Sequence, residues 1–269
     1  MTAIPATTVA NVRDLGGTAL PRGRSVRPGL VFRSGRLDRL DPAADPAFAA
    51  LGLRTIIDLR TAPERSEHPD RIPDGVRLIV ADVLADTVTS GAMSAAARLK
   101  QVLADPAVTE QRLGGGKAQE LFKETYRSFV TSDSAQSAYR VLLTELAEPD
   151  AGPLLVHCTA GKDRTGWAVA VLLTLLGADK KTIEREYLIV NAAVRQAFAP
   201  LVEGFIAQGG DPETALAVIG VVPEYLAAGL AEVDTRYGSM EKYVREGLGV
   251  PDAAVERIRT RLVTDPAAA

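Results

Sequence analysis

The chain has 269 residues and a mass of 28.5 kDa, and a domain of this size can bury a large apolar core without disulfide or metal staples. Hydrophobic residues make up 46% of the sequence and charged residues 24%, a composition that excludes a disordered or fibrous protein. The 31 basic and 34 acidic side chains give a net charge of -3, so the sequence lacks the basic excess of proteins that bind nucleic acid.

The first third of the chain alternates short strand-like runs with turn residues. Strands are predicted from Leu30 to Arg33, from Thr55 to Leu59 and from Val76 to Val80. Between the first two strands, an alanine-rich stretch from Asp41 to Leu51 has helical spacing. The order strand, helix, strand favours a largely parallel sheet.

The middle of the chain is predicted to be helical. Helices are expected from Gly91 to Leu103, from Ala118 to Val130 and from Ser134 to Ala147, with the glycines at 114–116 as a flexible connector. From Lys180 onward the helical pattern continues with breaks at glycine and proline, without an internal repeat or a clear domain linker. We therefore expect a single domain over residues 1–269.

One segment between these regions differs in character. Leu154 to Val156 is a short unbroken apolar run, typical of a central strand that is buried on both faces. The sequence HCTAGKDRTG follows at residues 157–166, and helical spacing resumes from Trp167 to Leu176 before Gly177. This order predicts a loop between a buried strand and a helix N-terminus, a position at which proteins bind anions.

The residue types in this loop suit a phosphoryl group. Five residues separate Cys158 from Arg164, which lets the backbone N–H groups between them curl inward around an anion. Gly161 can adopt a positive φ, and the guanidinium of Arg164 can bond two phosphate oxygens at once. The same electropositive setting favours the thiolate form of Cys158, which is the nucleophilic form. A Walker A loop is excluded, because Val156 stands where that motif needs glycine and Asp163 where it needs serine or threonine.

The other composition signals are mostly negative. Cys158 is the only cysteine, which excludes an internal disulfide and a multi-cysteine metal site. His68 and His157 are the only histidines, which leaves little material for a histidine-rich metal centre. The apolar run Trp167 to Leu176 is half as long as the roughly twenty residues of a bilayer span, so no integral membrane segment is expected. The N-terminal residues lack the pattern of a signal peptide, which predicts a protein that is cytoplasmic or exported without one.

The motif H-C-x5-R-T-G between an apolar strand and a helix resembles the signature of cysteine-dependent phosphatases. With Lys162 and Asp163 before the arginine, it is similar to the atypical bacterial tyrosine phosphatases, which also hydrolyse phosphoserine, phosphothreonine and phosphoinositides. Val12 stands where that family usually has phenylalanine. Further segments in the family's order cover essentially the whole chain: Asn11 to Gly17, Phe32 to Gly35, Asp58 to Arg60, Tyr126 to Phe129, Tyr187 and Leu188 with Asn191, and Tyr237 to Ser239.

The resemblance implies a cysteine-phosphatase-like α/β fold, with a central, mostly parallel sheet of about four or five strands flanked by helices and a helical C-terminal extension. It implies hydrolysis through a phosphocysteine formed on Cys158, without a cofactor or metal. Thr165 would place a hydroxyl near the sulfur, and His157 would support the loop by hydrogen bonding. The phosphate ligands would be the side chain of Arg164 and the loop residues Thr159, Ala160, Gly161 and Lys162.

The general acid is open between two carboxylates. The family favours the aspartate inside the phosphate loop, here Asp163, and Asp58 at the end of a predicted strand is the alternative. Arg13 and Asp14 fit two interpretations equally, as residues at the mouth of the site or as an ion pair that fixes a loop. His68 is expected to be an ordinary surface residue.

The expected partners are phosphorylated proteins and, as an alternative, phosphoinositide lipids or inositol phosphates, since Lys162 adds a cation beside the bound phosphate. A different class, an inactive phosphate-binding module, would usually have lost Cys158 or Arg164, and both are present. The apolar segment at about 194–222 fits either amphipathic core helices or, as the resemblance implies, a helical lid over the active site.

Overall fold

A six-stranded sheet forms the centre of the molecule, in the order β1-β2-β4-β7-β5-β6. The computed structural model describes residues 2–86 and 105–265. Four strands, β4, β7, β5 and β6, pair in parallel, and the short β1 and β2 add antiparallel pairs at one edge. The strand bounds are Thr2–Ala3 for β1, Arg13–Asp14 for β2, Val31–Ser34 for β4, Thr55–Asp58 for β5, Arg77–Val80 for β6 and Leu154–His157 for β7.

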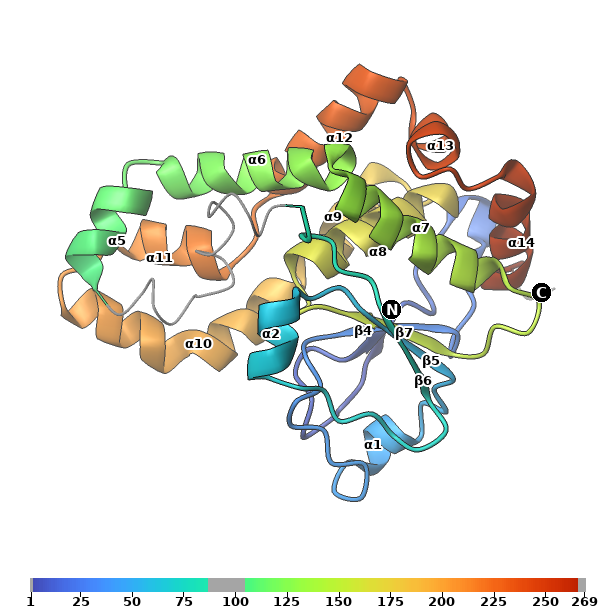
Figure 1. Cartoon of the computed structure of the whole chain (residues 1–269), viewed down its shortest axis with the longest axis horizontal. Coiled ribbons are helices and arrows are strands. Elements are labelled where there is room, and N and C mark those ends of the chain that lie inside the picture. The colour runs from blue at the N-terminus through green and yellow to red at the C-terminus, as the bar shows by residue number, and fades with distance from the viewer. Residues whose placement is uncertain (1, 87–104, 266–269) are drawn as a thin grey trace.

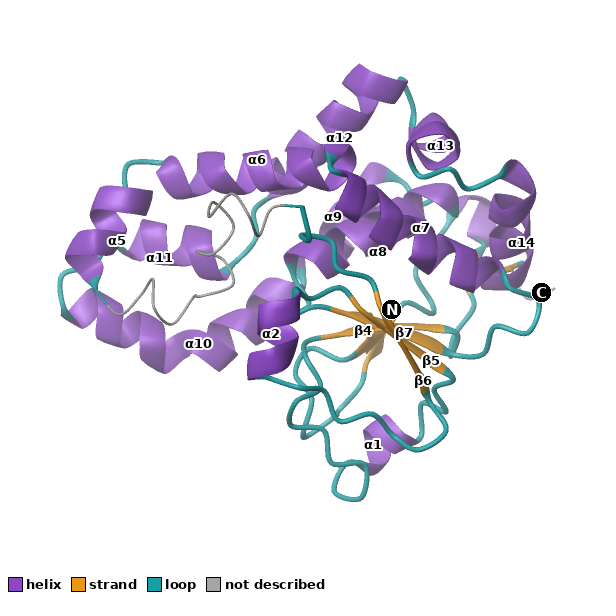
Figure 2. Cartoon of the chain, in the orientation of Figure 1, coloured by secondary structure: helices purple, strands orange, loops and turns teal. Residues whose placement is uncertain are grey.

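Helices follow the strands and pack mainly against one face of the sheet, as Figures 1 and 2 show. A separate two-stranded ribbon joins β3 (Ser25–Val26) to β8 (Val263–Thr264). The longer helices are α5 (Pro106–Leu113), α6 (Lys117–Thr131), α7 (Asp133–Ala147), α8 (Asp163–Leu175), α9 (Lys180–Leu188), α10 (Val190–Ala207), α11 (Pro212–Ile219), α12 (Pro223–Tyr237) and α14 (Asp252–Leu262). The shorter ones are α1 (Pro46–Ala49), α2 (Ala62–Glu67) and α13 (Met240–Lys242), the last continuing into a π-helical turn at Tyr243–Gly247.

Alternation along the parallel strands divides the core into two parts. Leu154 and Val156 of β7 join the main cluster beneath the helices, whereas Leu155 belongs to a second cluster on the opposite face, with Phe48 of α1. This is the side-chain pattern of a strand whose successive residues point to opposite faces of the sheet. Both faces of β7 are therefore buried, which holds the loop that follows it on a rigid support.

The expected α/β fold with a mostly parallel sheet is confirmed, with corrections in detail. The sheet has six strands rather than four or five, because two-residue strands carry no sequence pattern that predicts them. The stretch Asp41 to Leu51 forms only the short α1, since Pro46 begins this helix and Gly52 follows it at positive φ. The glycines at 114–116 make the turn between α5 and α6. The helix expected from Gly91 to Leu103 lies outside the described residues.

A helical arm extends to one side of the sheet, at the left of Figure 1. We use this name for α5, α10, α11 and the N-terminal part of α6. A small apolar cluster holds α11 on α6, in which Val218 and Ala217 meet Ala118 and Leu113. Within the described ranges, no single helix is long and apolar enough to cross a bilayer, and only the pair α11 and α12, bent by 49°, meets that test on length and composition.

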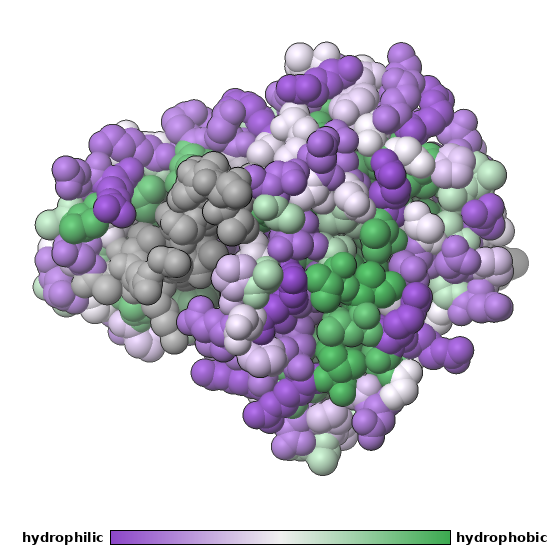
Figure 3. Space-filling model, in the orientation of Figure 1, coloured by the Kyte–Doolittle hydropathy of each residue, from purple (hydrophilic) through white to green (hydrophobic). Residues whose placement is uncertain are grey.

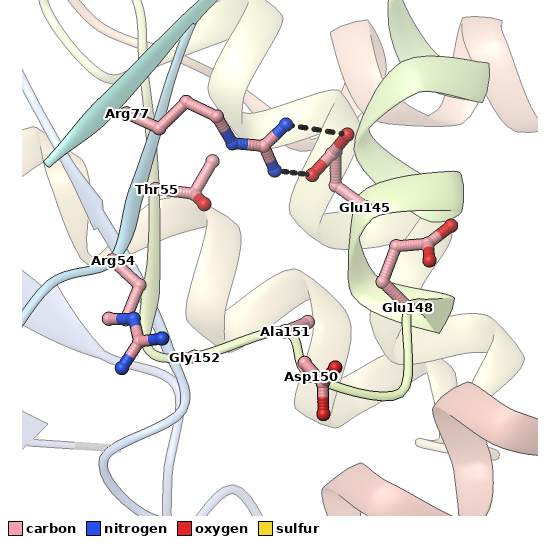
Figure 4. A pocket seen from close by; sticks show the side chains of 8 residues that line it. All are labelled: Arg54, Thr55, Arg77, Glu145, Glu148, Asp150, Ala151 and Gly152. Carbon is pink, nitrogen blue, oxygen red and sulfur yellow. Dashed lines mark hydrogen bonds and ion pairs between the residues drawn. The ribbon is translucent and has the colours of Figure 1, made fainter.

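Two features lie away from the loop. On the face shown in Figure 3 there is a hydrophobic patch, and the edge strand β6 exposes 40% of Leu78 and 47% of Val80. Figure 4 shows a polar pocket of about 230 Å³ lined by Arg54, Arg77 and Glu145, among others. It lies where β5, β6 and β7 begin, and is therefore at the opposite end of the sheet from the loop after β7.

Candidate active site

The sequence HCTAGKDRTG lies at the carboxyl end of the central strand β7. In the sheet, His157 pairs in register with Ser34 of β4 on one side and Asp58 of β5 on the other. Cys158 follows at once and is only 2% exposed. The motif is less of a loop than the sequence predicts, because α8 begins at Asp163 and places Arg164 on its first turn. The positive end of α8 is therefore part of the site.

The loop is held from outside by two side chains. Arg33 of β4 donates from Nη2 to the carbonyl of Gly161 at 2.5 Å, and Asn11 donates from Nδ2 to the carbonyls of Ala160 and Gly161 at 3.4 and 3.3 Å. Gly161 has φ +67°, and a Cβ there would lie 2.3 Å from the carbonyl oxygen of Ser34, so glycine is required.

The backbone of the loop is left ready to bind an anion. Among the described residues, the N–H groups at positions 159–162 have no intramolecular acceptor. Several unpaired N–H groups in succession, next to a helix N-terminus, form a concave site that attracts a phosphate. The arrangement agrees with the anion loop that the sequence predicts at these positions.

Glu64 of α2 aligns the arginine of the motif. Arg164 Nη1 lies 2.7 Å from Glu64 Oε2 and Nη2 lies 2.8 Å from Oε1, and the hydroxyl of Thr159 also donates to Glu64. Burial alone would raise the pKa of Glu64, but the charge and hydrogen bonds of Arg164 hold this pKa well below its usual range. The capping box with Thr61 fixes Glu64 in turn. The guanidinium plane of Arg164 is thus set before any substrate arrives.

The carboxyl group of Asp163 lies between a tyrosine pair and a lysine. Its Oδ1 is 3.4 Å from the hydroxyl of Tyr126, which accepts a hydrogen bond of 2.7 Å from Tyr187. Its Oδ2 is 3.2 Å from Nζ of Lys162. The ammonium of Lys162 also donates to backbone carbonyls near the end of α11, so this side chain faces the helical arm. Of Lys162, only the backbone N–H remains for a phosphate in the loop.

Asp58 belongs to a buried charge network beneath the loop. Both of its oxygens accept hydrogen bonds from Arg60, whose Nη2 also lies 2.5 Å from Asp70. His157 places Nε2 3.2 Å from Asp70 and Nδ1 3.2 Å from the carbonyl of Cys158. Burial would raise the pKa of Asp70, but His157 and Arg60 lower it. These contacts fit the supporting role expected of His157, and both oxygens of Asp58 are occupied by Arg60.

This network also offers three metal-ligand atoms, from Asp58, Asp70 and His157, within 4.8 Å of one another. A cation would have to compete there with the guanidinium of Arg60, which already contacts both carboxylates. The donor set therefore does not fit a metal ion.

Two further residues of the motif region are buried beside it. Thr165 is fully buried, and its hydroxyl has no hydrogen-bond partner among the described residues. Tyr139 of α7 donates its hydroxyl to the carbonyl of Arg164 at 3.3 Å, which ties α8 to the helix layer. A free hydroxyl on the first turn of α8 suits the role that the resemblance implies for Thr165.

Arg13 and Asp14 have different partners in the structure and do not form an ion pair with each other. Asp14 accepts hydrogen bonds from the N–H groups of Gly16 and Gly29, which pins a loop. Arg13 lies buried beside Arg33, and its Nη2 is 3.5 Å from Glu186. Burial and the charge of Arg33 lower the pKa of Arg13 to about 9.

Sequence reasoning missed three carboxylates. Glu64 and Asp70 lie in segments without a motif, and only the capping pattern T-A-P-E marked Glu64. Asp82 follows β6 at the carboxyl edge of the sheet, where burial raises its pKa while Arg65 and Arg164 lower it. His68, expected at the surface, is 38% exposed in its side chain and lies 3.6 Å from Asp38.

A buried cysteine at the carboxyl edge of an α/β sheet, with a helix N-terminus a few residues further on, suits the binding of a phosphoryl group, and the comparisons identify the family. Residues 4–264 match the profile described as the tyrosine phosphatase family. The chain belongs to this family and is a phosphomonoester hydrolase of the protein-tyrosine-phosphatase type.

Three relatives show how much of the chain is shared. Triple specificity protein phosphatase PtpB of Mycobacterium tuberculosis is 35% identical over 93% of this chain and 95% of its own. A candidate tyrosine-protein phosphatase of Cupriavidus necator is 29% identical, over 90% of this chain and 83% of its own. A tyrosine-protein phosphatase of Nostoc commune is 28% identical, over 90% of this chain and 76% of its own. The similarity thus spans both the sheet and the helical part.

Proposed function

We propose that the protein hydrolyses phosphotyrosine and other phosphomonoesters through a covalent phosphocysteine at Cys158. One observation carries this proposal: a buried cysteine stands at the start of a loop whose N–H groups lack acceptors in the described part of the chain, next to an arginine that Glu64 holds in place. Such donors stabilise both a bound phosphate dianion and a thiolate. They also match the charge that develops on the equatorial oxygens during transfer.

The reaction takes two displacements at phosphorus. In the first, the thiolate of Cys158 forms an S–P bond while the ester P–O bond breaks, and Asp163 gives its proton to the leaving oxygen. In the second, water attacks the phosphorus, its proton passes to Asp163, and the S–P bond breaks to return the thiolate and release phosphate. The hydroxyl of Thr165 stabilises the thiolate as it leaves. Arg164 and the loop N–H groups bind the phosphoryl oxygens throughout.

The assignment of the acid to Asp163 is favoured by its surroundings. Asp163 lies on the first turn of α8, next to Arg164, and 15% of its side chain is exposed. Asp58 is fully buried, and Arg60 occupies both of its oxygens. A proton donor needs access to the substrate, so the partial exposure of Asp163 supports its assignment over that of Asp58.

The substrate range beyond phosphotyrosine is supported by the name of one relative, a triple specificity protein phosphatase that shares most of this chain. The argument for phosphoinositides from the charge of Lys162 is weakened, because its ammonium already bonds two carbonyls and contacts Asp163. Phosphorylated proteins are therefore the proposed partners, and phosphoinositides or inositol phosphates are tested beside them.

We also propose that residues 1–269 form one phosphatase domain in which the segment 194–222 covers the site. The end of this segment reaches the phosphate loop, since the carbonyls of Val218 and Gly220 each accept a hydrogen bond of 2.9 Å from Lys162. A cover in this position would shield Cys158 from oxidants between turnovers.

Hydrolysis of p-nitrophenyl phosphate in EDTA, followed by a panel of phosphopeptides and phosphoinositides, tests the proposed function. We expect turnover in EDTA, a fall of several orders of magnitude in Cys158→Ser, and retained vanadate binding by that variant. Residual activity of Cys158→Ser above about 1% of wild type would exclude the phosphocysteine route, because loss of a nucleophile costs far more. Hydrolysis of phosphoinositides faster than of phosphopeptides would favour the alternative substrate class.

A further inference from the structure

Lys162 is an internal lysine with a complete set of partners. The residue is 6% exposed, and Nζ donates to the carbonyl oxygens of Val218 and Gly220 at 2.9 Å each. The third partner is Asp163, 3.2 Å away, and Nζ also lies 4.6 Å from the ring centroid of Phe122 in α6. An ammonium has three N–H donors, and these three oxygens account for all of them. Lys162 would have to leave this site to contact a phosphate directly.

The two carbonyls come from the last turn of α11 and from Gly220 just after it, and the connection that follows is fixed independently of Lys162. Asn191 of α10 donates from Nδ2 to the carbonyl of Val221 at 2.9 Å and accepts from its N–H at 2.8 Å. The side chain of Val218 packs in the small cluster between α11 and α6. The acceptors of Lys162 are thus built into the helical arm, whereas Lys162 itself belongs to the phosphate loop.

Lys162 contacts both the helical arm and Asp163, and so links the arm to the proposed general acid. Asp163 has a neutral hydroxyl, that of Tyr126, at one oxygen and the ammonium of Lys162 at the other. A charged group at 3.2 Å orients a carboxylate more strongly than a hydroxyl at 3.4 Å does. The rotamer of Asp163 therefore depends on where Lys162 is held.

We infer that Lys162 is a positioning residue: held by the carbonyls of Val218 and Gly220, its ammonium keeps Oδ2 of Asp163 as an acceptor, so that the acid form carries its proton on Oδ1 and gives it from there to the leaving group. The inference rests on the proposed function, in which Asp163 is the general acid. It adds that the docked end of α11 is required for the acid step, although it contributes no side chain to the phosphate loop. The acid step should then be sensitive to changes in the arm.

The test compares leaving groups, because general acid catalysis matters most when the leaving oxygen is basic. Rates are measured for p-nitrophenyl phosphate and for phenyl phosphate in Asp163→Asn, Lys162→Met and Asn191→Ala. Arg259→Met is the matched control, since Arg259 also donates to a backbone carbonyl, that of Leu175, in another part of the helix layer. The inhibition constant of inorganic phosphate is measured for each variant.

We expect Lys162→Met to lose on the order of ten times more activity on phenyl phosphate than on p-nitrophenyl phosphate, a part of the full effect of Asp163→Asn. Asn191→Ala should show the same selectivity to a smaller degree, with phosphate inhibition near that of wild type, and Arg259→Met should show none. If Lys162→Met fails to fold, the selectivity of Asn191→Ala decides the question.

Two results would overturn the inference while leaving the rest of the mechanism in place. Equal losses on both substrates together with weaker phosphate inhibition would make Lys162 a phosphate ligand. Absence of selectivity in Lys162→Met and Asn191→Ala, with selectivity in Asp163→Asn, would separate the arm from the acid step. Absence of selectivity in Asp163→Asn would show that Asp163 is not the general acid, and this inference would fail with that assignment. The role of Cys158 as nucleophile is tested separately, by Cys158→Ser.

Discussion

Arg164 and Glu64 form a two-pronged ion pair in which each nitrogen of the guanidinium fork meets one carboxylate oxygen, at 2.7 and 2.8 Å. The two residues are far apart in the sequence, one on the first turn of α8 and the other on α2. Because both are buried, the pair holds the guanidinium in one plane and supplies the negative charge that an isolated buried arginine would lack. The arginine of the motif is thus held by a carboxylate that lies outside the motif.

Glu64→Gln should reduce both activity and stability at neutral pH. We expect kcat/KM to fall on the order of 100-fold as Arg164 loses its alignment, and the free energy of unfolding to fall by about 3–5 kcal/mol as a buried charge loses its partner. Since the pKa of Glu64 is held below its ordinary value of 4.5, its stabilising effect is complete above that pH and is lost as the pH falls further.

Urea unfolding of Glu64→Gln and wild type at pH 7 and at pH 3 measures this effect. The stability difference should be larger at pH 7. Glu67→Gln on the same helix is the control, because the side chain of Glu67 is 78% exposed. A difference that is the same at both pH values would contradict the role of the Glu64 charge.

The three carboxylates near the loop can be separated by substitution. Asp163→Asn should lose on the order of 10²-fold or more on phosphoserine peptide and much less on p-nitrophenyl phosphate, whose leaving group needs no proton. Asp58→Asn should lose activity equally on both, because it breaks the buried pair with Arg60. Asp82→Asn, which removes a carboxyl of raised pKa near Arg164, should also be unselective. Selective loss in Asp58→Asn or Asp82→Asn instead would assign the acid to that residue.

Arg13→Met should stabilise the protein. Arg13 is buried with three nitrogens that lack hydrogen bonds among the described residues, and its one charged contact, Nη2 at 3.5 Å from Glu186, is to a carboxylate that Arg33 already holds with two hydrogen bonds. Replacement of such a cation by an apolar side chain should raise the free energy of unfolding by about 1–4 kcal/mol. Because burial lowers the pKa of Arg13 to about 9 in the folded chain, its cost is complete below that pH and declines above it.

Unfolding by urea at pH 7 and pH 10 tests this pH dependence. The gain from Arg13→Met should be larger at pH 7 than at pH 10. A loss of stability at pH 7 would show that the contact of Arg13 with Glu186 outweighs the cost of burying its charge.

The proposed cover over the site predicts a change in oxidation rate. Val218→Asp places a charge in the apolar cluster that holds α11 on α6, and should raise the rate at which peroxide inactivates the enzyme severalfold. Leu216→Asp is the control on the same helix, because Leu216 is 42% exposed and Val218 only 2%. If a folded Val218→Asp variant is inactivated at the rate of wild type, the segment 194–222 consists of core helices only.

The parts of the site that are local in sequence were predictable, and the parts that depend on tertiary contacts were not. The strand Leu154–His157, the anion loop and the need for glycine at 161 follow from short-range patterns. The partners of Arg164, His157 and Lys162 come from α2, the loop after it and the end of α11. No spacing rule relates such segments, because only the packing of the helices on the sheet brings them together.

The direction of the Lys162 side chain is a second feature that depends on tertiary contacts and could not be predicted from the sequence. Its position in the motif suggested a cation for the phosphate. The sequence does not reveal that the carbonyl of Val218 in α11, the carbonyl of Gly220 just after it and the ring of Phe122 surround the ammonium group. The end of α11 and Gly220 are distant in the sequence from Lys162, and their carbonyls determine where its side chain points.

The most direct test of the account is a search for the covalent intermediate. The enzyme is mixed with p-nitrophenyl phosphate, quenched in acid within one turnover and digested, and the peptide that contains Cys158 is analysed by mass spectrometry. We predict that this peptide gains the mass of one phosphoryl group on the sulfur, that the modified fraction rises in Asp163→Asn if that residue also assists the second step, and that Cys158→Ser gives none. A turnover-competent enzyme whose Cys158 peptide stays unmodified throughout the first turnover would contradict the phosphocysteine mechanism.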